Sequence, residues 1–206
     1  MVKVKICGIT NLEDAQASAN AGCDALGFVF YKKSPRYILP EKAAGIIRKL
    51  PGTVMKIGVF VNAREKTIRR IIKRCGINIL QFHGRESIEF CRRFKDYKII
   101  KAFRMRGRMD PRQILRYKTF AYLFDAFMES KPGGTGKNFN WKLVRHIDGI
   151  TRPVFLSGGL SSGNVKKAIE VVRPEWVDVS SSVEIKPGKK DHKKVREFIK
   201  AAKSKS

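Results

Sequence analysis

Residues 153–183, PVFLSGGLSSGNVKKAIEVVRPEWVDVSSSV, contain a complete strand–helix–strand unit. The short apolar runs Pro153–Ser157 and Trp176–Ser180 are rich in Val, Phe and Trp, a composition that predicts β-strands. Between them, Ser161–Val172 carries apolar residues at the spacing of one helix face. A helix that connects two such strands indicates a βαβ unit, in which the strands run parallel.

The same alternation runs through the whole chain of 206 residues. The remaining expected strands are Val2–Cys7, Ala25–Phe30, Val54–Val61, Ile79–His83, Lys98–Phe103 and Ala121–Asp125. The expected helices are Asn11–Ala21, one from Pro40, Glu65–Cys75, Ser87–Phe94, one capped by Asp110, one capped by Asn140, Ser161–Val172 and one from Asp191. A (β/α)8 barrel needs at least about 200 residues, so this chain would form one with short loops. We therefore expect an α/β fold, a single-domain TIM barrel over residues 1–202 with a frayed tail at 203–206.

The chain is strongly basic, with 44 Lys and Arg against 18 Asp and Glu and a formal net charge of +26. Such an excess attracts anions of any kind. The charge is spread along helical stretches such as Arg69–Arg74 and Lys189–Lys194, which predicts solvated outer faces. No zinc-finger, RNP-like or basic-zipper pattern is present, so no specific nucleic-acid partner is expected.

Three other patterns limit the class of protein. No run of about 20 apolar residues predicts a membrane span. The stretch Val2–Ile6 lacks the apolar core of a signal peptide, so we expect a cytoplasmic protein. The four cysteines and three histidines show no metal-ligand spacing, so we expect neither a metal nor another cofactor.

The first strand ends in a cysteine, and TIM-barrel active sites lie where the strands end. Side chains alternate along a strand, so Cys7 shares a face with Lys5, whereas Val4 and Ile6 share the opposite face. The apolar set suits packing beneath the helices, which directs Cys7 and Lys5 toward the barrel axis. A lone cysteine is more often a buried core residue, but nearby cations can make it a usable thiolate.

Carboxylates and cations also occur at or near strand ends. Asp125 closes an apolar strand, which is costly unless the carboxyl has partners or a task; a turn or cap aspartate is an equal alternative. Lys5, Lys101 and Asp178 are all expected inside the barrel, so we predict an ion-paired network below the site. His83 is interpreted as a satisfied member of that network rather than as a catalytic group.

Two kinds of loop suggest an anionic ligand. Glycine- or serine-rich segments follow the last three strands, where barrels commonly bind phosphate through backbone N–H groups. These segments are Pro132–Lys137, Ser157–Leu160 and Ser180–Glu184. Arg36 lies on a proline-stiffened loop after the second strand and could bind a substrate carboxylate with paired hydrogen bonds.

Together these segments resemble the phosphoribosylanthranilate isomerase family over essentially the whole chain. The matching segments are Lys5–Thr10, Gly27–Phe30, Ser34–Tyr37, Gly58–Val61, Gln81–Gly84, Phe124–Asp125, Gly133–Gly136, Phe139–Trp141, Leu156–Leu160, Asn164–Val165 and Val177–Ser181. The resemblance implies an Amadori rearrangement in tryptophan biosynthesis, from N-(5-phosphoribosyl)anthranilate to 1-(2-carboxyphenylamino)-1-deoxyribulose 5-phosphate. It also implies general acid/base catalysis without a cofactor, by a monomer or a homodimer.

The resemblance assigns roles to particular residues. Cys7 would be the general base and Asp125 the general acid. The implied substrate-binding residues are Arg36, His83 and Asp178, and the implied phosphate-binding residues are Gly134, Gly158, Gly159, Ser181 and Ser182.

Two positions depart from the family pattern. Ser182 stands where glycine is usual, which would strain the backbone by about 1 kcal/mol if that residue had a positive φ. Asn140 replaces an aspartate, a nearly silent change because both residues cap helices well.

Two alternatives are weighed against this function. An isomerase of histidine biosynthesis usually carries aspartates at the ends of strands one and five, but here those strands end at Cys7 and near Phe103–Arg104. A basic binding protein could instead use the barrel only as a scaffold.

Overall fold

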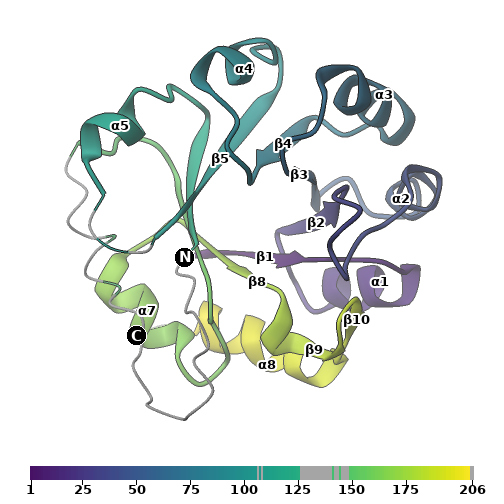
Figure 1. Ribbon diagram of the computed structural model, residues 1–206. Coiled ribbons are helices and arrows are strands. Elements are labelled where there is room, and N and C mark those ends of the chain that lie inside the picture. Colours follow the sequence, from purple (N-terminus) through teal and green to yellow (C-terminus); the bar gives the residue numbers. More distant parts are fainter. Residues whose placement is uncertain (106, 108, 126–140, 142–143, 145–148, 205–206) are drawn as a thin grey trace.

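The computed structural model describes residues 1–105, 107, 109–125, 141, 144 and 149–204, which form a closed barrel of parallel strands surrounded by helices (Figure 1). The strands are β1 (Lys3–Cys7), β2 (Ala25–Val29), β3 (Met55–Phe60), β4 (Ile79–Phe82), β5 (Lys98–Arg104), β6 (Ala121–Asp125), β7 (Val154–Ser157) and β8 (Trp176–Val179). Each strand pairs with the next, and β8 pairs with β1 to close the barrel. The predicted α/β barrel is confirmed.

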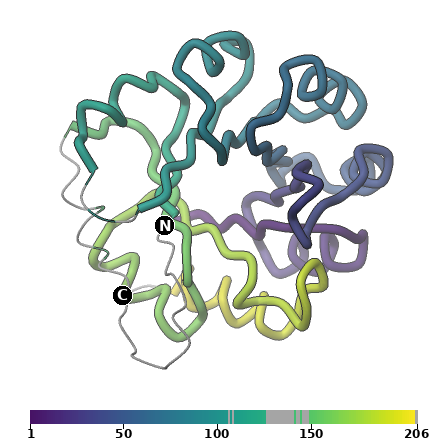
Figure 2. The backbone as a smooth tube through the Cα atoms, in the orientation of Figure 1, coloured from purple at the N-terminus to yellow at the C-terminus, as the bar shows by residue number. Residues whose placement is uncertain are grey.

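Helices cover the outside of the barrel. The described helices are α1 (Leu12–Asn20), α2 (Pro40–Ile47), α3 (Glu65–Cys75), α4 (Ile88–Arg92), α5 (Pro111–Leu115), α7 (Val165–Val172) and α8 (His192–Lys203). Figure 2 shows the chain passing once around the ring, so that its last segments lie beside its first. The helix expected after Asn140 lies outside the described residues.

The sequence analysis did not predict the segment between β8 and α8. A short 3-10 helix, η1 (Ser181–Val183), is followed by a two-stranded antiparallel hairpin of β9 (Glu184–Lys186) and β10 (Lys189–Lys190). This hairpin packs beside the start of the chain, and the carbonyl of Gly188 accepts a hydrogen bond from the Thr10 hydroxyl. The hairpin contributes two residues to the site described below.

The side-chain alternation expected for β1 is confirmed. Val4 and Ile6 are fully buried in the layer between strands and helices, whereas Lys5 points into the barrel and meets Asp178 of β8. A separate apolar cluster fills the lower barrel interior. Its members are Ala25, Ile57, Ile79, Ile100, Ala102, Ala121, Leu123, Phe155 and Trp176. The barrel is therefore a packed core up to the level of Lys5 and Asp178, and any ligand site must lie above them.

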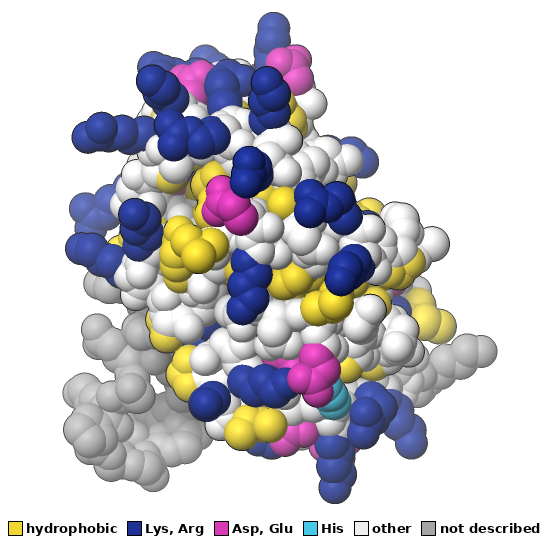
Figure 3. All heavy atoms as spheres, turned by 90° about the vertical axis from the view of Figure 1, so that its right-hand side faces the viewer, with side chains coloured by type: hydrophobic (Ala, Val, Ile, Leu, Met, Phe, Trp, Pro, Cys, Tyr) yellow, Lys and Arg dark blue, Asp and Glu magenta, His cyan; other side chains and the backbone are white. Residues whose placement is uncertain are grey.

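The helices are amphipathic, and their basic residues face solvent. In α3, Ile68, Ile71 and Ile72 are buried against the barrel while Arg69 and Arg70 are exposed. Figure 3 shows Lys and Arg scattered over this side of the molecule rather than gathered into one patch. Among the described residues, no helix combines the length and apolar character that crossing a membrane requires.

The predicted internal ion pairing divides into two separate pairs. Lys5 Nζ lies 2.8 Å from Asp178 Oδ1, as expected. Lys101 does not join them: its Nζ lies 2.9 Å from Glu86 Oε2 and donates to the Gly84 carbonyl at 2.7 Å. Glu86 lies in the loop that follows β4. Its carboxylate also accepts hydrogen bonds from the backbone N–H groups of Asn62 and Gly84, which hold it in place.

Glu86→Ala should lower the free energy of unfolding by about 3–5 kcal/mol, because it leaves the Lys101 ammonium buried without its counter-charge. Urea-induced unfolding followed by circular dichroism measures this loss. Glu65→Ala is the matched control, since Glu65 forms solvent-exposed pairs with Arg69 and Arg93 and should change stability little. Equal losses in the two variants would contradict this account of the buried pair.

Candidate active site

A cleft of about 1050 Å³ opens at the carboxyl ends of the barrel strands. The sequence-predicted site residues that the structure describes all line it. They are Cys7, Arg36, His83, Asp125, Gly158, Gly159, Asp178, Ser181 and Ser182. Gly134, the remaining phosphate-binding prediction, lies outside the described residues.

Cys7 occupies the end of β1, and a glycine on the neighbouring strand makes room for it. A Cβ atom on Gly27 of β2 would lie 2.7 Å from the Cys7 Sγ, well inside van der Waals contact. Burial raises the pKa of the Cys7 thiol, and the positive charges of Lys5 and Lys190 act in the opposite direction. Cys7 is thus a thiol whose reactivity depends on the lysines beside it.

Asp125 ends β6 and meets the histidine that follows β4. His83 Nε2 lies 3.2 Å from Asp125 Oδ2, and Gln81 Nε2 lies 2.8 Å from His83 Nδ1. With the Gln81 amide donating to Nδ1, the imidazole carries its proton on Nε2 and donates to the carboxylate. His83 is therefore hydrogen-bonded to Asp125. The expectation that His83 belongs to a network with Lys5, Lys101 and Asp178 is wrong.

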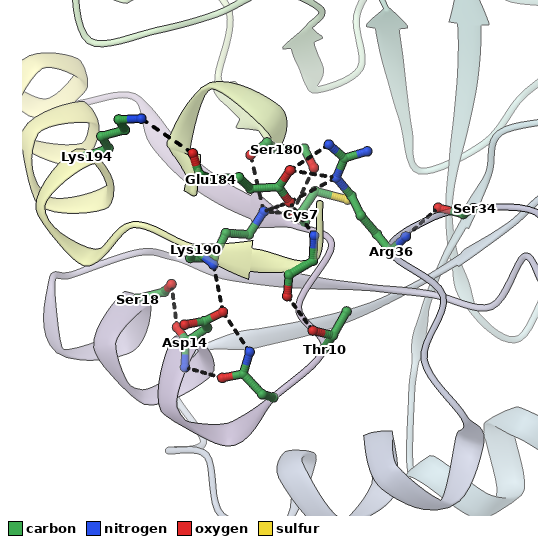
Figure 4. A network of polar contacts seen from close by, with 12 residues as sticks. Cys7, Thr10, Asp14, Ser18, Ser34, Arg36, Ser180, Glu184, Lys190 and Lys194 are labelled. Carbon is green, nitrogen blue, oxygen red and sulfur yellow. Dashed lines mark hydrogen bonds and ion pairs between the residues drawn. The ribbon is translucent and has the colours of Figure 1, made fainter. Parts of the chain in front are cut away.

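Arg36 is held by a carboxylate of the protein (Figure 4). Its Nε and Nη2 lie 2.9 Å and 2.6 Å from Glu184 Oε1 and Oε2, which makes a two-pronged ion pair. Lys190 Nζ lies 2.9 Å from the same Glu184 Oε1. Arg36 thus projects into the cleft from a fixed base.

Another part of the cleft wall is formed by the loops after β7 and β8. Gly158 and Gly159 have φ angles of 91° and 66°, which only glycine adopts without strain. Ser182 belongs to η1, and among the described residues only Asn62 and Arg173 are non-glycine residues with positive φ. The strain considered for Ser182 is therefore absent. Its hydroxyl donates to the Leu160 carbonyl and ties the two loops together.

Sequence reasoning missed four residues at this site, namely Gly27, Gln81, Glu184 and Lys190. Lys190 was part of a basic run interpreted as solvated, and this interpretation is wrong for it, since only 1% of the residue is exposed. The β9–β10 hairpin turns Lys190 inward, and no local pattern signals that. The ion pair between Glu184 and Arg36 could not be predicted from the sequence either, because the two residues lie far apart in the chain.

The fold and the cleft define a TIM-barrel enzyme with a thiol, a carboxyl–imidazole pair and glycine- and serine-rich loops at one mouth. The family model for N-(5'-phosphoribosyl)anthranilate (PRA) isomerase matches residues 4–201. The N-(5'-phosphoribosyl)anthranilate isomerase of Thermotoga neapolitana is 52% identical over 204 residues, which cover 98% of this chain and 99% of that protein. The chain belongs to the N-(5'-phosphoribosyl)anthranilate isomerase family and is an isomerase of tryptophan biosynthesis.

Solved structures agree with this assignment. The phosphoribosyl anthranilate isomerase of Thermotoga maritima superposes with a TM-score of 0.91 at 48% identity, covering 98% of this chain and 99% of that one. A second structure of such an enzyme is a complex with reduced 1-(o-carboxyphenylamino)-1-deoxyribulose 5-phosphate. It superposes with a TM-score of 0.84 at 45% identity, covering 98% of this chain and 99% of that one. Family membership favours this function over a histidine-biosynthesis isomerase or a basic binding protein.

Gly27→Ala should lower kcat/KM by about 100-fold, because the new methyl group displaces the Cys7 sulfur from its position. The fold should persist, which a thermal melt checks. Gly45→Ala on α2 serves as the control, since a Cβ there meets nothing within 4 Å. Full activity in the Gly27 variant would show that the position of the sulfur is unimportant.

Proposed function

We propose that Cys7 is the general base and Asp125 the general acid in the Amadori rearrangement of N-(5-phosphoribosyl)anthranilate. The observation that carries the proposal is their placement: a thiol ending β1 and a carboxyl ending β6 line the same cleft. The cleft is large enough for a phosphosugar with an attached aromatic ring.

The reaction requires two proton transfers on one substrate. Asp125 protonates the furanose ring oxygen, and the ring opens to a Schiff base. The Cys7 thiolate then removes the proton from C2, which gives an enolamine that tautomerises to the ketone. General acid and base groups each contribute about 10²–10⁴-fold to such steps.

His83 contributes to the first transfer through its contact with Asp125. The N–H of His83 Nε2 points at Asp125 Oδ2, so the acidic proton belongs on the other carboxyl oxygen. When Asp125 gives up that proton, the hydrogen bond becomes charge-assisted and stronger. An interaction that strengthens during the step accelerates it.

The two ends of the substrate bind to different residues of the cleft. Among the described residues, Glu184 occupies Nε and one N–H of Nη2 of Arg36. The N–H groups of Nη1 and the second N–H of Nη2 bind the anthranilate carboxylate. The phosphate binds to backbone groups of Gly134, Gly158, Gly159, Ser181 and Ser182. Asp178, held by Lys5 on Oδ1, has a second oxygen for a sugar hydroxyl.

The chain is proposed to form a homodimer. The support is a relative, the phosphoribosylanthranilate isomerase of Thermotoga maritima, which is described as dimeric and is 45% identical over 98% of this chain. Light scattering coupled to size exclusion would give twice the mass of 23.4 kDa.

Cys7→Ser and Asp125→Asn should each lower kcat by at least about 100-fold while the fold persists. The loss of anthranilate fluorescence on incubation with phosphoribosylanthranilate measures the rate. Cys75→Ser is the matched control, because Cys75 lies at the end of α3 and not at the cleft. Near-normal turnover in either site variant would refute its assigned role.

The catalytic efficiency should fall several-fold as the ionic strength rises from about 0.05 M to about 0.5 M. The net charge of +26 attracts a substrate that carries a phosphate and a carboxylate, and salt screens this attraction. Measurements of kcat/KM at fixed pH test this. An efficiency that stays constant would mean that the basic surface does not assist substrate capture.

A further inference from the structure

The β9–β10 hairpin places a buried lysine between the ends of β1 and β8 (Figure 4). Lys190 Nζ donates to the carbonyls of Cys7 at 2.6 Å and Ser180 at 3.2 Å, and it contacts Glu184 Oε1 at 2.9 Å. An ammonium group has three N–H donors, so these contacts use all of them. Lys190 therefore has no donor left for a ligand and acts on its protein neighbours.

Glu184 connects this lysine to Arg36. Its carboxylate lies between the two cations, although Glu184 is not among the residues that line the cleft. Burial by itself would raise the pKa of Glu184, but the hydrogen bonds from Arg36 and Lys190 outweigh it, so the pKa lies below its ordinary value. Glu184 is thus ionised at neutral pH and reaches the substrate only through Arg36.

The hairpin that carries Lys190 is itself anchored by contacts with Asp14 of α1. The Lys190 amide donates to Asp14 Oδ2 at 2.7 Å, and His192 Nε2 lies 2.8 Å from Asp14 Oδ1. Asp14 is fully buried at the start of α1, where Asn11 caps the helix. This anchoring holds the Lys190 ammonium at the strand ends against the entropy of a long side chain.

The charges that face Cys7 come from three elements. Burial raises the pKa of the Cys7 thiol, and Lys5 on β1 opposes this through its charge and a hydrogen bond to the thiol. The charge of Asp178 on β8 raises the pKa, which offsets part of the Lys5 effect. Lys190 on β10, which pairs with Glu184, adds a second positive charge that lowers it.

We propose that Lys190 and Glu184 are a pair of positioning residues: Lys190 fixes Cys7 and favours its thiolate, and Glu184 fixes Arg36 for the substrate carboxylate. The proposal rests on the roles assigned above to Cys7 and Arg36. It accounts for a buried ion pair that a barrel of this kind does not need for closure, since β1 and β8 already pair through their backbones.

The first experiment measures the thiol without substrate. Iodoacetamide alkylation of Cys7, followed by mass spectrometry over a range of pH, reports the thiolate fraction. In Lys190→Met the alkylation rate at pH about 8 should fall about tenfold, because removing a neighbouring cation raises the pKa of the thiol. Lys190→Arg should restore part of the rate. Lys186→Met, at an exposed position on the same hairpin, should leave it unchanged.

The second experiment is a double-mutant cycle on the full-length enzyme. Glu184→Gln should raise KM about tenfold with a smaller change in kcat, and it should have no further effect in an Arg36→Met background. Unchanged alkylation in a folded Lys190→Met variant, or additive effects of Glu184→Gln and Arg36→Met, would overturn the proposal. If Lys190→Met does not fold, the alkylation rate of Lys190→Gln decides the Lys190 effect, and an unchanged rate overturns it.

The two experiments separate this proposal from the assigned catalytic roles. The alkylation rate does not depend on turnover, so it can support the Lys190 effect even where Cys7→Ser retains activity. That combination would refute the base assignment and leave the electrostatic effect standing.

Discussion

The ion pair between Lys5 on β1 and Asp178 on β8 joins the first and last strands where the barrel closes. Both side chains are almost fully buried, with Nζ and Oδ1 2.8 Å apart. Removing either partner would leave a charge in the barrel interior, which costs several kcal/mol. The pair therefore fixes the register of the closing strands and separates the apolar core below from the cleft above.

The cleft is organised around the same seam. Cys7 follows Lys5 on the inner face of β1, and Lys190 joins the carbonyls at the ends of β1 and β8. The proposed general base and the Glu184–Arg36 pair are thus held by the same strand ends. The proposed acid lies at the end of β6, where it contacts His83, which follows β4 and is itself held by Gln81 of β4. Acid and base sit on separate strands of a closed barrel, so their separation cannot change without deforming the sheet.

Much of the fold could be predicted from the sequence, because the barrel repeats one local pattern. Strand and helix periodicities located β1 through β8, and the alternation in β1 predicted that Lys5 points inward and that Val4 and Ile6 point outward. Strand ends also identified Cys7 and Asp125, since a polar residue at the end of an apolar strand is conspicuous, and side-chain alternation placed Asp178 inside the barrel. The roles of these residues came from the family resemblance and not from periodicity.

The contacts that the sequence did not reveal join residues far apart in the chain. Arg36 and Glu184 are separated by 148 positions, and Cys7 and Lys190 by 183. The burial of Lys190 follows from a short hairpin whose residues look like a solvated basic run. The need for Gly27 comes from the position of a sulfur atom on the next strand. Such constraints appear only when the closed barrel brings the strands together.

The central claim is that Cys7 and Asp125 act on the same substrate from two sides. A crystal structure of this protein with reduced 1-(2-carboxyphenylamino)-1-deoxyribulose 5-phosphate tests it directly. The account predicts the Cys7 sulfur within about 4 Å of C2, the Asp125 carboxyl beside the oxygen that leaves the ring, and the carboxylate on Arg36. A ligand bound with C2 turned away from Cys7, or with Asp125 out of reach of that oxygen, would contradict it.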